Sequence, residues 1–305
     1  RTESAATAAL ADARAKLLAV RGRRVRPHRD DKVITAWNGL MIAALAHGAR
    51  ALDEPELAGR AAKAAEFVWT RLRNADGGLL RRYRDGEAAV AGQLDDHAYF
   101  ARACLELHAA THEPRWLERA AAVTDAMLAR FWDDGDGAFF ESPSDANGIA
   151  IRMKDGHDGA ELAGNSVASE VLLRLATLLE RADWRVWAER SLTFHSRQLK
   201  GAPQAMPWML SAMERGASPP RHTVIVGPRD RDDTRALIRE YESRLRPDDD
   251  LVVVSDDTRD ALARWVPFAA KMPERDGRAT AYVCRDYACR LPVHEPAEMA
   301  ALLEE

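Results

Sequence analysis

Residues 96–131, DHAYFARACLELHAATHEPRWLERAAAVTDAMLARF, decide the fold. Apolar residues recur at helical spacing on both sides of the polar turn THEPRW, which predicts helices over Asp96–Ala110 and Trp116–Phe131. A connection this short makes two helices antiparallel neighbours. The stretch therefore predicts a helical hairpin.

Similar hairpins flank this one. The turn LDEPEL joins Trp37–Leu52 to Leu57–Leu72, the turn ERADW joins Ser166–Leu179 to Trp184–Leu199, and a leading helix is predicted over Ser4–Val20. A repeat of roughly 60 to 70 residues is typical of a helical-hairpin array. Unrelated bundle helices in an alanine-rich chain would give a similar pattern, so that alternative stays open.

The connections between hairpins are longer. Residues 74–93 and 133–163 are punctuated by glycines, and both predict β-hairpin excursions, the second with candidate strands at Ala138–Glu141 and Ile149–Met153. Short turns on one rim and long loops on the other predict a partial (α/α) toroid of antiparallel helical hairpins. Function is expected on the rim that carries the long loops.

The pattern changes near Arg215. Strands are expected over Thr223–Val226, Leu251–Val254 and Ala281–Cys284, and helices over Asp233–Arg244 and Glu295–Leu303. We therefore predict a mainly α chain with a partial toroid over 1–215 and a small α/β C-terminal subdomain over 216–305. The tail has no Gly-x-Gly-x-x-Gly motif, which argues against a dinucleotide site.

Composition excludes several classes of partner. With 305 residues and a net charge of −4, the chain lacks the basic balance of a nucleic-acid-binding protein. No apolar run reaches the roughly 18 residues of a membrane helix, and we expect a cytoplasmic protein. Cys104, Cys284 and Cys289 are too few for a secreted disulfide framework, and Cys284 and Cys289 are interpreted as structural thiols. His294 adds no complete ligand set, so we expect neither a metal ion nor a cofactor.

Three groups of residues could carry chemistry. Asp95, Asp96 and His97 open an apolar helix, where an aspartate can act as a base or simply cap the helix, and where the histidine can lie in the core. Asp158 and Glu161 in the second long loop are further acid–base candidates. Candidate ligand-binding residues are Trp37, Asn38, Arg82, Tyr83, Arg152, Lys154, Asn165 and Ser166. Helix caps, packing and a solvated loop are the structural alternatives for these residues.

Five stretches carry a resemblance to a known family: 30–46 (DDKVITAWNGLMIAALA), 94–111 (LDDHAYFARACLELHAAT), 139–142 (FFES), 155–176 (DGHDGAELAGNSVASEVLLRLA) and 281–296 (AYVCRDYACRLPVHEP). They resemble the C-terminal half of the thioredoxin-domain-containing proteins related to spermatogenesis-associated protein 20. The resemblance implies a toroid similar to that of N-acylglucosamine 2-epimerases and six-hairpin glycosidases. It implies no defined reaction.

The chain departs from the family pattern in two ways. Leu162 and Ala163 stand where relatives tend to carry Pro-Ser, so any role of that serine is lost. The family also has an upstream thioredoxin-like domain and a His-Phe-Glu-Lys element, which this sequence lacks. Since the chain begins at Arg1 without methionine, we expect a fragment holding an incomplete ring.

Two hypotheses of function follow, and whether the chain is an enzyme stays open. One is a carbohydrate-active domain, like an isomerase, epimerase or glycosidase, doing acid–base chemistry on a sugar or related polyol. The other is a non-catalytic binding or scaffold module that works with a thioredoxin-like domain or a missing N-terminal half. The enzyme hypothesis requires one concave pocket to unite the acid–base candidates Asp95, Asp96, His97, Asp158 and Glu161.

Overall fold

The computed structural model describes residues 3–146, 148–286 and 288–304, and it divides into two compact units. The first unit, Arg1–Lys32, holds helix α1 (Glu3–Gly22), which is rich in alanine and buries none of its side chains. The second unit, Val33–Glu305, holds all the elements described below.

The predicted helical hairpins are confirmed. Their helices are α2 (Thr35–Leu52) with α3 (Pro55–Arg71), α4 (Leu94–Thr111) with α5 (Pro114–Phe131), and α6 (Gly164–Leu178) with α7 (Ala182–Gly201). A proline begins both α3 and α5, where its fixed φ suits the first helical turn and its missing N–H costs no hydrogen bond.

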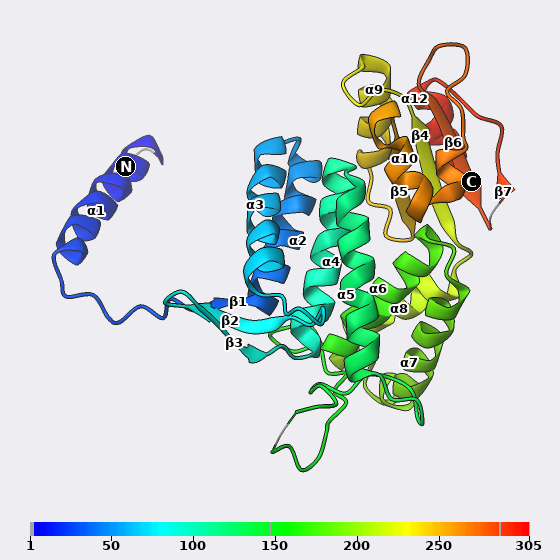
Figure 1. The fold of residues 1–305 in the computed structure, drawn as a ribbon. Coiled ribbons are helices and arrows are strands. Elements are labelled where there is room, and N and C mark those ends of the chain that lie inside the picture. Colours follow the sequence, from blue (N-terminus) through cyan, green and yellow to red (C-terminus); the bar gives the residue numbers. More distant parts are fainter. Residues whose placement is uncertain (1–2, 147, 287, 305) are drawn as a thin grey trace. The chain divides into compact units, whose positions relative to one another are not determined.

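These helices form a partial (α/α) toroid (Figure 1). Helices α2, α4 and α6 pack side by side as an inner row, and α3, α5 and α7 each pack against the inner helix of the same hairpin. After the short 3-10 helix η1 (Pro203–Ala205), helix α8 (Pro207–Ala217) packs on α6. The fold class predicted from the sequence is thus confirmed.

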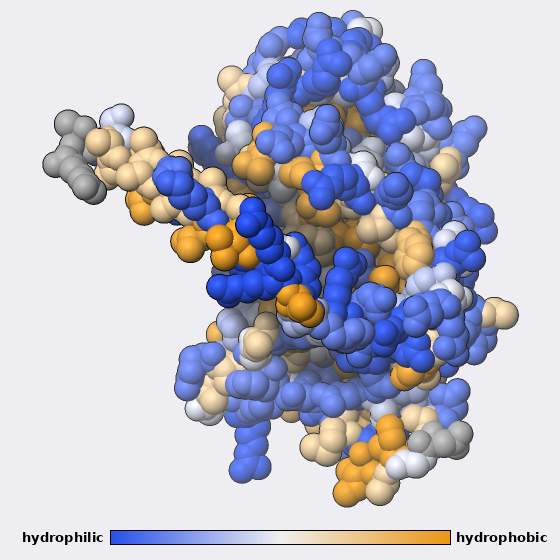
Figure 2. Space-filling view, turned by 90° about the vertical axis from the view of Figure 1, so that its left-hand side faces the viewer, coloured by the Kyte–Doolittle hydropathy of each residue, from blue (hydrophilic) through white to orange (hydrophobic). Residues whose placement is uncertain are grey.

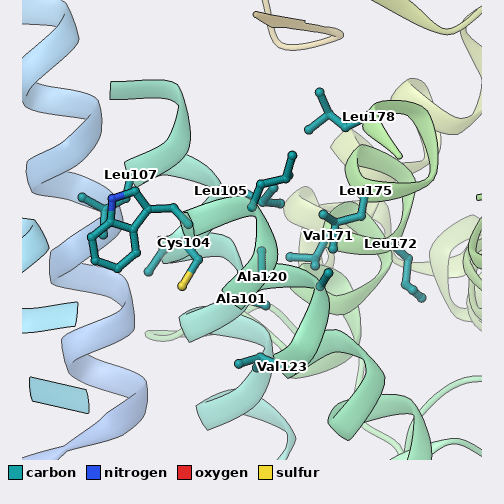
Figure 3. Close-up of a cluster of buried hydrophobic side chains, with 14 of the residues drawn as sticks. Ala101, Cys104, Leu105, Leu107, Ala120, Val123, Val171, Leu172, Leu175 and Leu178 are labelled. Carbon is teal, nitrogen blue, oxygen red and sulfur yellow. The ribbon is translucent and has the colours of Figure 1, made fainter. Parts of the chain in front are cut away.

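One buried cluster runs from α2 and α3 through α4, α5 and α6 to the C-terminal sheet, and its middle lies between α4, α5 and α6. Figure 3 shows Ala101, Leu105, Val123, Val171 and Leu175 in this cluster, and all five are almost fully removed from solvent. Burying one of the larger apolar side chains contributes roughly 1 to 3 kcal/mol to the free energy of folding. The face in Figure 2 is mainly hydrophilic, with hydrophobic residues in small patches.

Close packing of α2 on α4 depends on Gly39. A Cβ built there would lie 2.8 Å from the carbonyl carbon of Tyr99 and 3.0 Å from the amide nitrogen of Phe100, which are backbone atoms. We expect Gly39→Ala to lower the free energy of unfolding by about 1–3 kcal/mol, because the two helices must move apart. Urea unfolding measures this, with Gly59→Ala on α3 as the control because its Cβ would meet nothing within 4 Å. Equal effects of the two changes would contradict the packing.

The first long connection forms the predicted β-hairpin, and the second does not. Strands β2 (Leu80–Arg84) and β3 (Glu87–Ala91) pair antiparallel, and β1 (Val33–Ile34) joins β2. Among the described residues of 133–163 no strand forms. Side chains hold this loop instead: Arg152 donates to the carbonyl oxygen of Ser142, and Asn165 exchanges hydrogen bonds with the backbone of Phe139.

The C-terminal part is the predicted α/β arrangement. Its elements are β4 (Arg221–Val226), α9 (Asp232–Glu242), β5 (Asp249–Val254), α10 (Asp256–Trp265), α11 (Pro267–Ala270), β6 (Thr280–Arg285), β7 (Ala288–Cys289) and α12 (Pro296–Glu304). The sheet order is β5-β4-β6-β7, with β4 and β5 parallel and the other pairs antiparallel. Helices α10 and α11 were not predicted. The division at residue 215 stays a prediction.

The cysteines correct one expectation. Cys284 and Cys289, interpreted above as thiols, form a disulfide, because the pairing of β6 with β7 places them directly opposite each other. Cys104 is a free thiol in the core. Among the described residues, no helix combines the length and the apolar character needed to cross a membrane.

Candidate functional site

A cavity of about 300 Å³ opens at the N-terminal ends of α4 and α6, on the rim with the long connections. We call it the rim pocket. Its walls are Arg81, Gln93, Leu94, Asp95, Tyr99, Glu141, Asp155, His157, Glu161, Leu162, Ala163 and Gly164. Four of these residues are carboxylic acids and one is an arginine, so the pocket favours neutral or cationic ligands over anionic ones.

Asp95 lies in the wall of the rim pocket and is held in place by its neighbours. Its Oδ1 accepts hydrogen bonds from Arg81 Nη1 at 3.1 Å and from the backbone of Asp96 at 2.9 Å. Arg81 also bonds Asp96, so one guanidinium bridges two adjacent carboxylates. The side chain of Asp95 keeps a quarter of its surface exposed and can still reach a ligand.

Asp96 is fully buried and joins two helices. Its Oδ1 accepts from the backbone of Ala36 on α2 at 2.8 Å, and its Oδ2 accepts from the backbone of Gln93 and from Arg81, each at 2.9 Å. Burial, and then the charge of Asp95, raises the pKa of Asp96 to about 7. Asp96 thus caps the N-terminus of α4 by accepting from Gln93, and it anchors α2 by accepting from Ala36. This is the structural alternative that the sequence left open for it.

His97 lies in the core and outside the rim pocket. Its Nε2 accepts from the backbone of Leu79 at 3.0 Å, and its Nδ1 lies 2.9 Å from the carbonyl oxygen of Gln93. Burial lowers its pKa to about 4, so the ring is neutral near pH 7. Both ring nitrogens are engaged by backbone groups, so neither is left to exchange a proton with a ligand. Acid–base chemistry at His97 stays a prediction.

The two acid–base candidates of the second long loop, Asp158 and Glu161, lie in different surroundings. Asp158 accepts from the backbone of Ala163 at 2.9 Å and from that of Trp208 at 2.8 Å, so it ties this loop to the start of α8. Glu161 lines the rim pocket, and its Oε1 accepts from Trp37 Nε1 at 2.9 Å. Of the five predicted acid–base residues, the pocket therefore unites only Asp95 and Glu161. The requirement stated above for the enzyme hypothesis is not met by these five, and acid–base chemistry in the pocket depends on its other carboxylic acids.

Glu141 is the carboxylic acid that the sequence reasoning missed. It lines the rim pocket, and within the described part of the chain its carboxyl group has no hydrogen-bond or ion-pair partner. Burial, and then the charges of Asp155 and Asp95, raises its pKa. The stretch FFES contains this residue, but a strand was expected there. The signal in the sequence that could have found it is an acidic residue in the long connection that leads to the inner helix α6.

None of the eight predicted ligand-binding residues lines the rim pocket, and Trp37 reaches its wall only through the hydrogen bond to Glu161. Tyr83 packs edge-on against Phe67, and Arg82 pairs with Glu87 across the hairpin at 3.7 Å. The other structural contacts are Asn38 to a backbone carbonyl of its own helix, Arg152, Lys154 and Asn165 to the second long loop, and Ser166 in the core. Their binding roles stay predictions.

A second cavity, of about 450 Å³, lies between the inner helices, α8 and the start of β5. Its central charges are satisfied internally, while Arg246 and Asp249, which also line it, keep buried polar atoms without a hydrogen bond among the described residues. Arg174 Nη1 donates to Glu106 at 2.6 Å and its Nε donates to Asp250 at 3.1 Å, while Arg50 and Arg215 approach the same two acids. This network stabilises the fold and leaves the rim pocket as the better candidate site. Among the described residues, no group of three His, Cys, Asp or Glu side chains could hold a metal ion.

Comparisons with known proteins place the chain among relatives of greater length. It is 33% identical to spermatogenesis-associated protein 20 of Homo sapiens over 94% of its own residues and 38% of that protein. It is 30% identical to an uncharacterized protein of Caenorhabditis elegans over 93% of its own residues. The chain thus spans about two-fifths of the length of these relatives. No family model matches it.

Two solved structures have a similar course of helices. A cellobiose 2-epimerase of Bacillus thermoamylovorans gives a TM-score of 0.49 at 11% identity, over 87% of this chain and 67% of its own. An α-mannanase of glycoside hydrolase family 76 from Bacteroides thetaiotaomicron gives 0.47 at 15% identity, over 56% of this chain and 47% of its own. Both likenesses concern the course of the backbone and say nothing of the chemistry of this chain.

Proposed function

Since this chain belongs with the proteins related to spermatogenesis-associated protein 20, we propose that their shared segment is a carbohydrate-active domain whose rim pocket takes a neutral sugar or polyol. The family name states no reaction, so the support comes from the pocket. The observation that carries the proposal is the unpaired carboxyl of Glu141 in the same wall as the positioned carboxylate of Asp95. A cytoplasmic location and a thioredoxin-like partner domain remain predictions.

The two acids divide acid–base work between them. Glu141, whose pKa is raised by burial and by neighbouring carboxylates, is the better suited of the two to give a proton to a ligand oxygen. Asp95, held in place by its ion pair with Arg81, is positioned to accept a proton from the ligand. Tyr99, Glu161 and Asp155 supply further polar groups for hydroxyls. Such a pair fits the isomerase, epimerase or glycosidase class.

A binding module remains the second candidate for a specific reason. Asp96, His97 and Asp158, three of the five acid–base candidates, use their polar atoms to hold the fold. The acids that remain in the pocket, Asp95, Glu141, Asp155 and Glu161, can bind a sugar without turning it over.

We expect Glu141→Gln and Asp95→Asn to lower kcat at least about a hundredfold, since general acid–base catalysis contributes about 10²–10⁴-fold. The assay measures turnover of aldoses, ketoses and glycosides, with calorimetry for binding. In the unaltered chain, activity falls as the pH rises through the raised pKa of Glu141, because the acid must be protonated. Glu118→Gln on α5, which is exposed and outside the rim pocket, is the matched control.

The outcomes separate the two candidates. Sugar binding without turnover, weakened in Glu141→Gln, favours the binding module. If none of the sugars is bound or converted, or if Glu118→Gln has the same effect as Glu141→Gln, the rim pocket is not a carbohydrate site.

A further inference from the structure

A third cavity, of about 440 Å³, lies at the end of the C-terminal sheet and shares no residue with the rim pocket. The start of β4, the end of β6, β7, the segment before β5 and α12 line it. Four arginines, Arg221, Arg246, Arg285 and Arg290, take part in its walls. We call it the arginine pocket.

The sheet register brings two of these positive charges together. Arg221 on β4 stands directly opposite Arg285 on β6. Like charges facing each other across strands destabilise a sheet unless an opposite charge lies between or beside them. Asp249 stands opposite Arg221 on the other side, but in the described part of the chain no ion pair joins the two. At this end of the sheet the row of Asp249, Arg221 and Arg285 thus places two arginines beside one aspartate.

Several nitrogens of the arginines that line this pocket are buried without a hydrogen bond, and one of these residues, Arg246, also lines the second cavity. Nε of Arg221 and both Nε and Nη2 of Arg246 are shielded from solvent, and within the described residues they make no hydrogen bond. Buried donors of this kind are uncommon, because each costs free energy until an acceptor meets it. An acceptor with several oxygens would satisfy them.

Acidic and apolar groups define the ligand further. Asp248, Asp249 and Asp286 also line the pocket, and burial raises the pKa of Asp249 to about 7 although Thr223 donates to it. Oδ1 of Asp249 is also buried without a hydrogen bond among the described residues, against three such nitrogens of Arg221 and Arg246, so unpartnered donors outnumber unpartnered acceptors in this wall. The remaining wall is apolar and includes the side chains of Leu245, Val283, Leu302 and Leu303 and the Cys284–Cys289 disulfide.

We propose that the arginine pocket binds a small organic anion, with its phosphate or carboxylate group at Arg221 and Arg246 and its apolar body against α12 and β6. Guanidinium groups suit both head groups because they can donate two parallel hydrogen bonds. The cavity is large enough for a ligand of about the size of an aromatic ring with one charged substituent.

Calorimetric titration with phenyl phosphate, phenylacetate, inorganic phosphate and benzyl alcohol tests this proposal. We expect one site per chain that takes at least one of the two aromatic anions more tightly than inorganic phosphate or benzyl alcohol. The better aromatic anion identifies the head group. Arg221→Gln and Arg246→Gln should each weaken its binding about tenfold, as loss of a charged hydrogen bond does. Arg239→Gln, an exposed arginine of α9 outside the pocket, should not.

A measurement on the unaltered chain covers the case in which a variant misfolds. Phenylglyoxal modifies arginines, and the better aromatic anion should slow modification of Arg221 and Arg246, read by peptide mass spectrometry, but not that of Arg239. Absence of binding by both aromatic anions, equal weakening in Arg239→Gln, or unprotected Arg221 and Arg246 would each overturn the proposal.

Discussion

Replacing Arg174 by methionine should lower the free energy of unfolding by about 3–5 kcal/mol, the cost of removing one partner from a buried ion pair. Arg174 joins Glu106 on α4 to Asp250 on β5, and it also approaches Glu170 one turn away at 3.5 Å. Burial alone would raise the pKa of Glu106, but the charge of Arg174 lowers it. Without that charge, Glu106 loses its main counter-ion, and Asp250 loses the weaker of the two that it shares with Arg215.

Urea unfolding followed by circular dichroism measures this effect. Arg239→Met on α9 is the matched control, because that arginine is exposed and makes one long bond to a backbone carbonyl. A loss below about 1 kcal/mol for Arg174→Met would mean that the network is solvated and does not hold α4 to β5.

Asp96→Asn should lower the free energy of unfolding by about 2–3 kcal/mol. The amide keeps one acceptor, so one side-chain oxygen can serve Ala36, but its NH₂ group then faces the donors of Gln93 and Arg81. Arg81 also loses a charge that fixes it beside Asp95, and that change reaches the rim pocket.

The same unfolding assay tests this second change. Asp260→Asn on α10 is the control, since that carboxylate is exposed. If Asp96→Asn is as stable as the control, then Asp96 does not anchor α2 to α4. That result would favour the other interpretation given in the sequence analysis, in which Asp96 acts as a base on a ligand.

Much of the helical architecture could be predicted because it depends on local patterns. The spacing of apolar residues in 96–131 sets two helices, and the turn THEPRW leaves too little chain for anything but an antiparallel hairpin. The runs at Thr223–Val226 and Leu251–Val254 likewise are strands, as β-branched apolar runs usually are.

The site could be predicted only in part, because it depends on contacts between distant residues. Asp95 and Asp96 are adjacent in the sequence and chemically identical, yet one lines the pocket and the other is buried against the backbone of Ala36, sixty residues away. The role of Glu141 was hidden for the same reason. Its loop is held by Arg152 and Asn165 rather than by a strand ladder, and no local pattern encodes that.

The central claim is that a neutral sugar or polyol enters the rim pocket, and the indole N–H of Trp37 offers the most direct measurement of it. This N–H donates to Glu161, which lines the pocket, so its ¹H–¹⁵N resonance reports on a ligand there. We predict that titration with a sugar panel shifts this resonance, assigned by its loss in Trp37→Phe, in a saturable manner, and that Glu141→Gln weakens the response. A resonance that stays in place for every sugar, up to the highest concentration used, would contradict the claim.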